Sequence, residues 1–220
     1  FGSVDAGTYF QFQLRTDGAT LLGVGTATAT NPVGVGSSVS YSFTTSRTFP
    51  DATVVAATVG GNTVLKTNTK IAIAAQGATH RFSIICASAT TNHRIWLGCA
   101  DAFGTASKPT GCAAAMVYDA ATGSNWVLRV YDGSSASQTD YDTGHAYTTS
   151  EALEAEVYIS STLVKGRVRT AGGTWTAYQS ATTNIPPATT AMQHALLLVS
   201  TAAGSTTIYW RGSYCFATYS

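Results

Sequence analysis

Two glutamates, Glu154 and Glu156, stand two positions apart in the segment EALEAEVYIS. On a β-strand both side chains would share one face, about 6–7 Å apart. Glycoside hydrolases use two carboxylates about 5–10 Å apart, one of them as a general acid. The pair is therefore a candidate for sugar hydrolysis. The reading we favour is two solvated acids on the outer face of a strand, paired with Lys165, Arg167 and Arg169 on the facing strand.

Aromatic side chains near turn signals are candidates for binding a sugar without cleaving it. Such sites stack a ring on the sugar and direct polar groups at its hydroxyls. Trp126 shares a strand face with apolar residues and is predicted to lie in the core, whereas Tyr131 falls on the other face and is predicted to be exposed. Trp175 follows two glycines and is expected near a hairpin tip, where binding residues often lie. The candidate glycan-binding residues are Tyr131, Tyr141, His145, Trp175 and Tyr178.

Three aspartates, Asp132, Asp140 and Asp142, form a candidate calcium site. Calcium takes six to eight oxygen ligands, and three carboxylates supply few of them. Aspartates at turns also accept hydrogen bonds from their own backbone, which explains the pattern equally well. Apart from this calcium alternative, no cofactor is expected.

Nucleophilic catalysis finds no support in the chain, because no G-x-S-x-G elbow is present. His80, His93 and His194 fall at expected strand edges or turns and are predicted to lie on the surface. We therefore expect a protein that is not an enzyme.

The composition argues against two classes of partner. Charged residues make up only 10% of the 220 residues, the net charge is +1, and no run of Lys and Arg occurs, so no nucleic-acid partner is expected. No apolar run approaches the ~18 residues that a transmembrane helix needs, so membrane insertion is not expected. Hydrophobic residues make up 45% of the chain, which supplies enough apolar area for a packed core.

Four cysteines, Cys86, Cys99, Cys112 and Cys215, allow three pairings. They lack the close pairs that are typical of a zinc site. Three of them stand inside apolar strand-like runs, so we favour buried free thiols, with a Cys99–Cys112 disulfide as the alternative. The chain begins at Phe1, and whether this is a processed terminus stays open.

The elements that must position these residues are β-strands. Alternation of apolar and polar residues recurs along the chain, separated by Gly, Asn and Asp turn signals. Residues 150–156 contain helix formers, but their alternation continues into VYIS and favours a strand. With no alternation of strands and helices, the pattern predicts an antiparallel β-sandwich or barrel. Expected strands are 9–14, 38–44, 53–59, 63–65, 70–74, 81–88, 94–99, 114–118, 126–131, 162–169, 195–199 and 207–218.

Several short motifs follow one another between Thr79 and Ser220. They are HRIWLGCADAF, AAMVYDAATGSNWVLRVYDG, SQTDYDTGHAY, EALEAEVYISSTLVKGRVR, TTNIP and IYWRGSYCFATYS. In this order they resemble a concanavalin-like jelly-roll domain that recurs in virion proteins of tailed bacteriophages. One departure is Ser160-Ser161-Thr162, which stands where that family usually has an Asn-Gly-like turn.

The resemblance implies an all-β fold, an antiparallel β-sandwich of the concanavalin-like jelly-roll type. We expect one domain over residues 1–220, with residues 1–78 placed only by analogy. The linker-like residues 23–38 are either a loop or the hinge of an N-terminal arm.

The resemblance also implies a structural protein of the virion surface, assembled in the host cytoplasm: a head or tail fibre, a spike or a decoration component. Its expected partners are other virion proteins and a host-surface glycan, and a homo-oligomer, by preference a trimer, is expected. The alternative function is a carbohydrate-active enzyme that uses Glu154 and Glu156.

Overall fold

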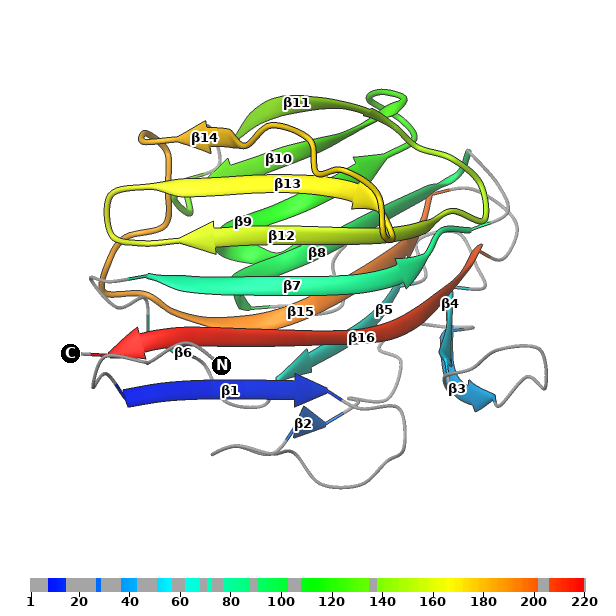
Figure 1. The fold of residues 1–220 in the computed structure, drawn as a ribbon, viewed down its shortest axis with the longest axis horizontal. Helices are drawn as coiled ribbons and strands as arrows, with labels where there is room; N and C mark the ends of the chain where they lie inside the picture. The colour runs from blue at the N-terminus through cyan, green and yellow to red at the C-terminus, as the bar shows by residue number, and fades with distance from the viewer. Residues whose placement is uncertain are drawn as a thin grey trace.

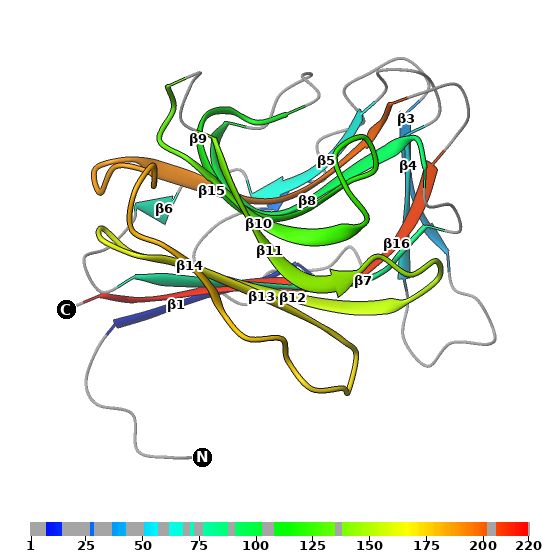
Figure 2. The same ribbon diagram turned by 90° about the horizontal axis from the view of Figure 1, so that it is seen from above.

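The protein is an antiparallel β-sandwich. The computed structural model describes residues 8–14, 27–28, 37–42, 51–56, 62–67, 71–72, 77–87, 91–102, 108–134, 138–201 and 206–219. All regular structure in these residues is β-strand, arranged in two sheets that pack face to face (Figure 1 and Figure 2). The predicted all-β sandwich is therefore confirmed. None of the described segments forms a helix that is long and apolar enough to cross a bilayer.

The first sheet, here called the β12 sheet, is the flatter of the two (Figure 2). Its strands run in the order β14, β13, β12, β7, β16, β4 and β3, and β1 also pairs with β16. Their bounds are Gln179–Ala181 for β14, Val164–Thr170 for β13, Ala152–Ile159 for β12, Ala78–Ile85 for β7, Thr206–Tyr219 for β16, Asp51–Ala56 for β4, Ser37–Ser42 for β3 and Thr8–Leu14 for β1.

The second sheet, here called the β8 sheet, curves away from the first (Figure 2). Its strands run in the order β11, β10, β9, β8, β15, β5 and β2, and β6 also pairs with β15. Their bounds are Thr139–Ala146 for β11, Asn125–Tyr131 for β10, Thr110–Asp119 for β9, His93–Ala102 for β8, Ala191–Ser200 for β15, Asn62–Thr67 for β5, Ala27–Thr28 for β2 and Ile71–Ala72 for β6.

The β10–β11 pair is a hairpin whose second strand the alternation did not predict. The segment TDYDTGHA, which is not among the expected strands, is the edge strand β11, and its side chains alternate between half-buried and exposed. A shift in register between Asn125 and Val127 bends the pair. The strand preferred for residues 150–156 is confirmed, because β12 spans Ala152–Ile159.

The main core lies between the two sheets. Trp126, predicted to be in the core, is fully buried there with Trp210, Leu97 and Leu153. Gly166 on β13 faces this core, and a Cβ at that position would come within 2.8 Å of a methyl carbon of a leucine on β10. Side chains of neighbouring residues on a strand point to opposite faces. Because Gly166 faces the core, Lys165 and Arg167 on either side of it point outward.

Candidate functional site

The outer face of the β12 sheet carries charged side chains in register. Glu156 lies opposite Arg81 on β7 and opposite Arg167 on β13, and Glu154 lies opposite Arg169. Opposite charges at directly facing positions stabilise a pair of strands. The register therefore sets one acid between two arginines across three neighbouring strands.

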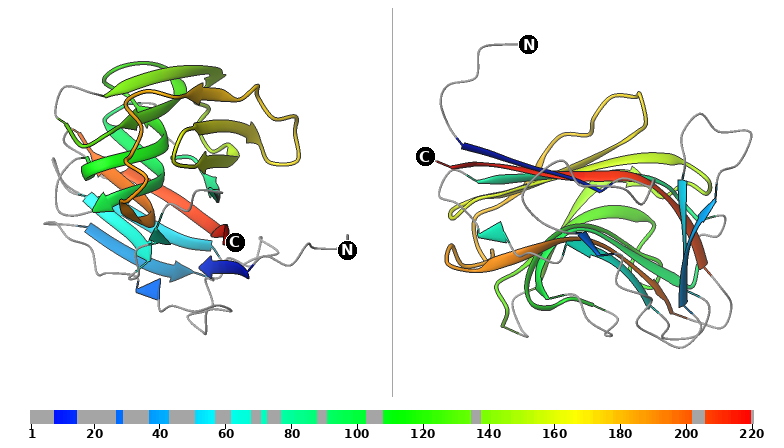
Figure 3. Two further views of the ribbon diagram at one scale, coloured as in Figure 1. Left: turned by 90° about the vertical axis from the view of Figure 1, so that its left-hand side faces the viewer. Right: turned by 90° about the horizontal axis from the view of Figure 1, so that it is seen from below.

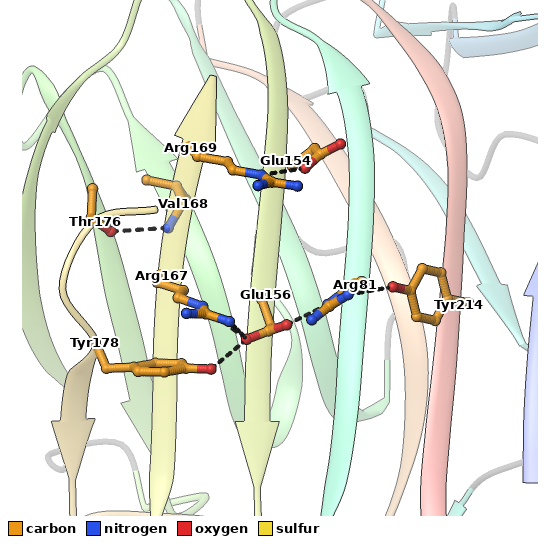
Figure 4. A network of polar contacts seen from close by, with 9 residues as sticks. All are labelled: Arg81, Glu154, Glu156, Arg167, Val168, Arg169, Thr176, Tyr178 and Tyr214. Carbon is orange, nitrogen blue, oxygen red and sulfur yellow. Dashed lines mark hydrogen bonds and ion pairs between the residues drawn. The ribbon is translucent and has the colours of Figure 1, made fainter. Parts of the chain in front are cut away.

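Glu156 is at the centre of this group and is only 2% exposed. Its Oε1 accepts hydrogen bonds from Arg167 Nε at 2.9 Å and from the Tyr178 hydroxyl at 2.5 Å. Its Oε2 accepts a hydrogen bond from Arg81 Nε, and Arg81 Nη1 donates to the Tyr214 hydroxyl at 2.8 Å (Figure 4). The expectation of a solvated acid is wrong for Glu156, because its partners surround it.

Glu154 has a simpler environment. It is about one-third exposed and accepts one hydrogen bond, from Arg169 Nε at 2.5 Å (Figure 4). The expected pairing of the two glutamates with Arg167 and Arg169 is therefore confirmed. Lys165 instead faces Tyr158 across the β12–β13 ladder.

Residues 171–178, here called the strap, connect β13 to β14 and fold back over β13. They lie on the side of the β12 sheet that faces away from the β8 sheet (Figure 2 and Figure 3). Gly172 turns the chain with a φ of 77°, which glycine adopts without steric cost. Thr176 N donates to Val168 O at 2.9 Å, and Val168 N donates to Thr176 Oγ1 at 3.2 Å. The strap is thus fixed to β13 by one hydrogen bond from its backbone and one to the Thr176 side chain.

The strap carries two aromatic rings, Trp175 and Tyr178, here called the platform. The Trp175 ring centroid lies 4.6 Å from Arg167 Cζ and 4.4 Å from Arg169 Cζ, and the Tyr178 centroid lies 4.1 Å from Arg167 Cζ. Cation–π contacts of this kind contribute about 0.5–1 kcal/mol each at partly exposed sites. Trp175 therefore lies in the loop of the β13–β14 hairpin, as predicted, and packs against side chains of β13. In the described part of the chain Tyr178 is the one exposed large hydrophobic side chain, at 42%.

The electrostatics of Glu156 differ from those of a catalytic acid. Burial alone would raise its pKa, but hydrogen bonds from Tyr178 and Arg81 and the charges of Arg81 and Arg167 hold the pKa below its usual value. Burial and the bond to this carboxylate raise the pKa of Tyr178. A general acid in sugar hydrolysis needs a raised pKa in order to carry a proton at neutral pH. The Glu156 carboxylate is already bound by Arg81, Arg167 and Tyr178. What the site can present to a ligand is therefore aromatic rings and N–H donors.

Tyr131 does not join the platform, and the prediction that it is exposed is wrong. It is 8% exposed, its hydroxyl donates to Pro109 O at 2.5 Å, and burial raises its pKa to about 12. It belongs to a second apolar cluster with Trp96 and Leu197, on the face of the β8 sheet that points away from the β12 sheet. The β8 sheet therefore buries side chains on both of its faces.

The other two aromatic candidates lie on β11. Tyr141 packs against the main core, and His145 Nε2 lies 3.0 Å from Glu151 Oε1. The structure thus brings Trp175 and Tyr178 together on one sheet and places Tyr141 and His145 at the edge of the other.

The three aspartates use their carboxylates locally. Asp140 accepts two hydrogen bonds from Arg129, from Nε and Nη2, each at 2.7 Å. Asp132 and Asp142 each accept a hydrogen bond from the backbone amide two residues further on, at 2.9 and 2.8 Å. Among the residues that the structure describes, no group of three or more His, Cys, Asp or Glu side chains is placed to hold a metal ion.

The outer face of the β8 sheet carries a row of ion pairs that no motif in the sequence indicates. Arg94 Nε donates to Asp119 Oδ2 at 2.7 Å, and Arg129 Nη1 lies 3.6 Å from the same oxygen. Arg129, which is 3% exposed, also binds Asp140 and lies 5.2 Å from the Trp96 ring centroid. Arg129 faces Asp140 directly across the β10–β11 hairpin, a pairing that the sequence would indicate only if residues 139–146 were recognised as a strand.

The three histidines expected on the surface are buried, so that expectation is wrong. His80 Nδ1 lies 2.9 Å from His194 Nδ1 between the sheets, and His93 Nδ1 lies 2.9 Å from Thr91 O.

All four cysteines are buried and free. The prediction of buried free thiols is therefore confirmed, and the alternative of a Cys99–Cys112 disulfide is wrong.

Comparisons with known proteins reveal the fold. No known family and no curated protein matches the sequence. Among solved structures, a protein of unknown function, SO2946 from Shewanella oneidensis MR-1, is similar with a TM-score of 0.72 at 14% identity, over 100% of this chain and 90% of that one. The CBM2 module of the evolved Dit of Lactobacillus casei BL23 phage J-1 has a TM-score of 0.61 at 8% identity, over 97% and 98% of the two chains. Peanut lectin has a TM-score of 0.57 at 8% identity, over 97% and 99%. The chain therefore has a concanavalin-like, lectin-type β-sandwich fold.

Proposed function

We propose that this chain is a carbohydrate-binding structural component of a bacteriophage virion surface, in which Trp175 and Tyr178 stack on a sugar. The observation that carries the proposal is the platform itself, two rings of which Tyr178 remains 42% exposed on an outer sheet face. Sugars bind to proteins through their apolar ring faces together with a few directed hydrogen bonds. Arg167 and Arg169 lie against the platform and carry N–H groups of the kind that a sugar hydroxyl accepts.

The fixed strap supports the same proposal. Binding is weakened by the cost of ordering mobile side chains and loops. Here the two hydrogen bonds between Thr176 and Val168, and the guanidinium groups packed against the rings, hold the platform in place before a ligand arrives. A preformed platform of this kind is suited to recognition.

The virion role is supported by the order of motifs between Thr79 and Ser220 and by a phage module among the proteins of similar fold. On this proposal the chain is a fibre, spike or decoration component, assembled in the host cytoplasm with other virion proteins, and it forms a trimer. Antibody labelling of phage particles in the electron microscope would locate it on head or tail. Light scattering of the purified chain would measure its mass, and a monomer would contradict the trimer.

The proposal includes no hydrolysis and no metal. Glu156 is ionised and bound by Arg81, Arg167 and Tyr178, so it offers no proton to a leaving group. Glycan binding is therefore expected to survive EDTA, and no sugar release is expected from any bound glycan. If the wild type released sugar from a glycan and a Glu154→Gln/Glu156→Gln variant did not, the chain would be a carbohydrate-active enzyme instead.

A glycan array with matched variants tests the binding site. Trp175→Ala and Tyr178→Ala are each expected to lower affinity by about tenfold or more, since each removes a stacking ring. Tyr141→Ala removes a tyrosine from the edge of the other sheet and serves as the control, with affinity unchanged. Equal binding by the platform variants and the wild type would contradict the platform, and a wild type that binds no glycan would contradict carbohydrate binding itself.

A further inference from the structure

The charged side chains around the platform do not balance. Among the described residues of β7, β12 and β13, six charged side chains lie on this face: the cations Arg81, Lys165, Arg167 and Arg169, and the carboxylates Glu154 and Glu156. Four cations against two carboxylates leave an excess of two positive charges. The whole chain, with 12 cationic and 11 acidic residues, has a net charge of only +1. Positive charge is therefore concentrated at the platform.

Lys165 is the cation without a carboxylate. Its ammonium lies 5.6 Å from the Tyr178 ring centroid and 6.0 Å from the Tyr158 ring centroid. Within the described residues no acid pairs with it, whereas Glu154 binds Arg169 and Glu156 binds two arginines. An ammonium ion that lies beside rings and lacks a counter-ion attracts an anion from solution.

The arginines beside the platform also retain donors. Arg167 binds Glu156 through Nε and Nη2, and Arg169 uses Nε for Glu154 and Nη1 for Gly173 O. Each guanidinium has five N–H donors, so one terminal nitrogen of each has no partner among the described residues. Planar guanidinium groups bind carboxylate and phosphate oxygens well.

From this arrangement we propose that the platform takes an anionic glycan, in which a sugar ring stacks on Tyr178 and Trp175 while a carboxylate or phosphate group binds Lys165 and the free edges of the arginines. This proposal rests on the proposed function, and it names the ligand class for the same site. Charge and stacking act on one ligand because Lys165 lies against the ring on which the sugar stacks.

The test is binding of the full chain to three soluble polymers: neutral dextran, polygalacturonic acid and a glucosylated glycerol-phosphate teichoic acid. At low salt the wild type is expected to bind at least one anionic polymer about tenfold more tightly than dextran, and the difference is expected to shrink as salt rises. Binding of polygalacturonic acid would identify the anionic group as a carboxylate, and binding of the teichoic acid would identify it as a phosphate.

Variants of single lysines separate a built site from general attraction. Lys165→Gln is expected to lower affinity for the anionic polymer about fivefold. Lys108→Gln, at an exposed position between β8 and β9, removes the same charge elsewhere and is expected to have no effect. Equal losses in the two variants would overturn the inference.

The polymers also separate the two proposals. Dextran bound as tightly as the anionic polymers would overturn the anionic ligand and leave carbohydrate binding by the platform standing. Anionic binding that is lost in Lys165→Gln but unaffected by Tyr178→Ala would overturn the platform and with it this inference. Failure of the wild type to bind any of the three would count against both.

Discussion

Glu156 and Arg167 face each other directly across the β12–β13 ladder, with Arg167 Nη2 2.8 Å from Glu156 Oε1. Arg81 reaches the other carboxylate oxygen from β7, and Tyr178 reaches the first from the strap. A charge that is removed from water stabilises a fold only when its partners are well placed. This single carboxylate therefore links three strands and the platform.

Replacing Glu156 with Gln should destabilise the protein, because the change leaves Arg81 and Arg167 beside each other without a counter-charge. Loss of one partner from a fully buried ion pair costs about 3–5 kcal/mol, and the partly exposed arginines reduce this to about 2 kcal/mol. Urea unfolding monitored by tryptophan fluorescence measures the difference. Glu154→Gln, which removes an acid with one partner at a more exposed position, should cost no more than about 1 kcal/mol. Equal losses in these two variants would contradict the central role of Glu156.

Arg129 should matter more than a surface cation, because it is buried between Asp140 and Asp119. Arg129→Leu is expected to lower the free energy of unfolding by about 3–5 kcal/mol, since the buried Asp119 would retain Arg94 alone. Asp140→Asn keeps the contact between Arg129 and Asp119 and should cost about 1 kcal/mol. Thermal unfolding of the two variants measures the difference between them. If Arg129→Leu unfolded at the same midpoint temperature as the wild type, these ion pairs would contribute nothing to stability.

Alternation along the sequence predicted most strands because buried faces require apolar residues at every second position. It failed at β11, where TDYDTGHA has only Tyr141 to pack against the core. An edge strand needs little apolar area, since hydrogen bonds to β10 hold it in place. The three-residue β14 was too short to show any period.

The candidate site was predictable only where its contacts are local. Arg167 and Arg169 follow Glu156 and Glu154 in one hairpin, so their pairing could be inferred from the alternation. Arg81 lies 75 residues away from Glu156 in the chain, and no local pattern indicates that β7 lies beside β12. Tyr131 shows a second limit: alternation separates the two faces of a strand, but it does not reveal that both are buried.

The four cysteines should be unreactive in the native protein. All are buried, and burial raises the pKa of each thiol, to about 12 for Cys215, so little thiolate is present at neutral pH. A thiol-specific chromogenic disulfide reagent should therefore release almost no colour before unfolding and four equivalents in denaturant without reductant. Two equivalents in denaturant would indicate a disulfide and contradict the free thiols.

Acid should destabilise the fold through the pair formed by His80 and His194. Their Nδ1 atoms lie 2.9 Å apart, so one Nδ1 must donate a hydrogen bond and the other must accept it. A protonated histidine has N–H groups at both ring nitrogens, so two protonated rings would not fit this contact. Burial lowers the pKa of His80 from 6.5 to about 4, and burial together with the neighbouring His80 lowers the pKa of His194. In the unfolded chain both titrate near 6.5. As pH falls from about 6.5 towards 4, the unfolded state therefore binds protons that the native state does not, and stability decreases.

For His80 alone, a shift from 6.5 to about 4 corresponds to a loss on the order of 3 kcal/mol by pH 4. The double variant His80→Gln/His194→Gln should be less stable at pH 7, because it disturbs the core, yet its stability should depend less on pH between 6.5 and 4. Urea unfolding at several pH values in this window measures both quantities. Because Glu156 has a pKa below its usual 4.5, its own contribution is lost only at lower pH and leaves most of this window unchanged. If the double variant lost stability with the same pH dependence as the wild type, the titrating groups would lie elsewhere in the chain.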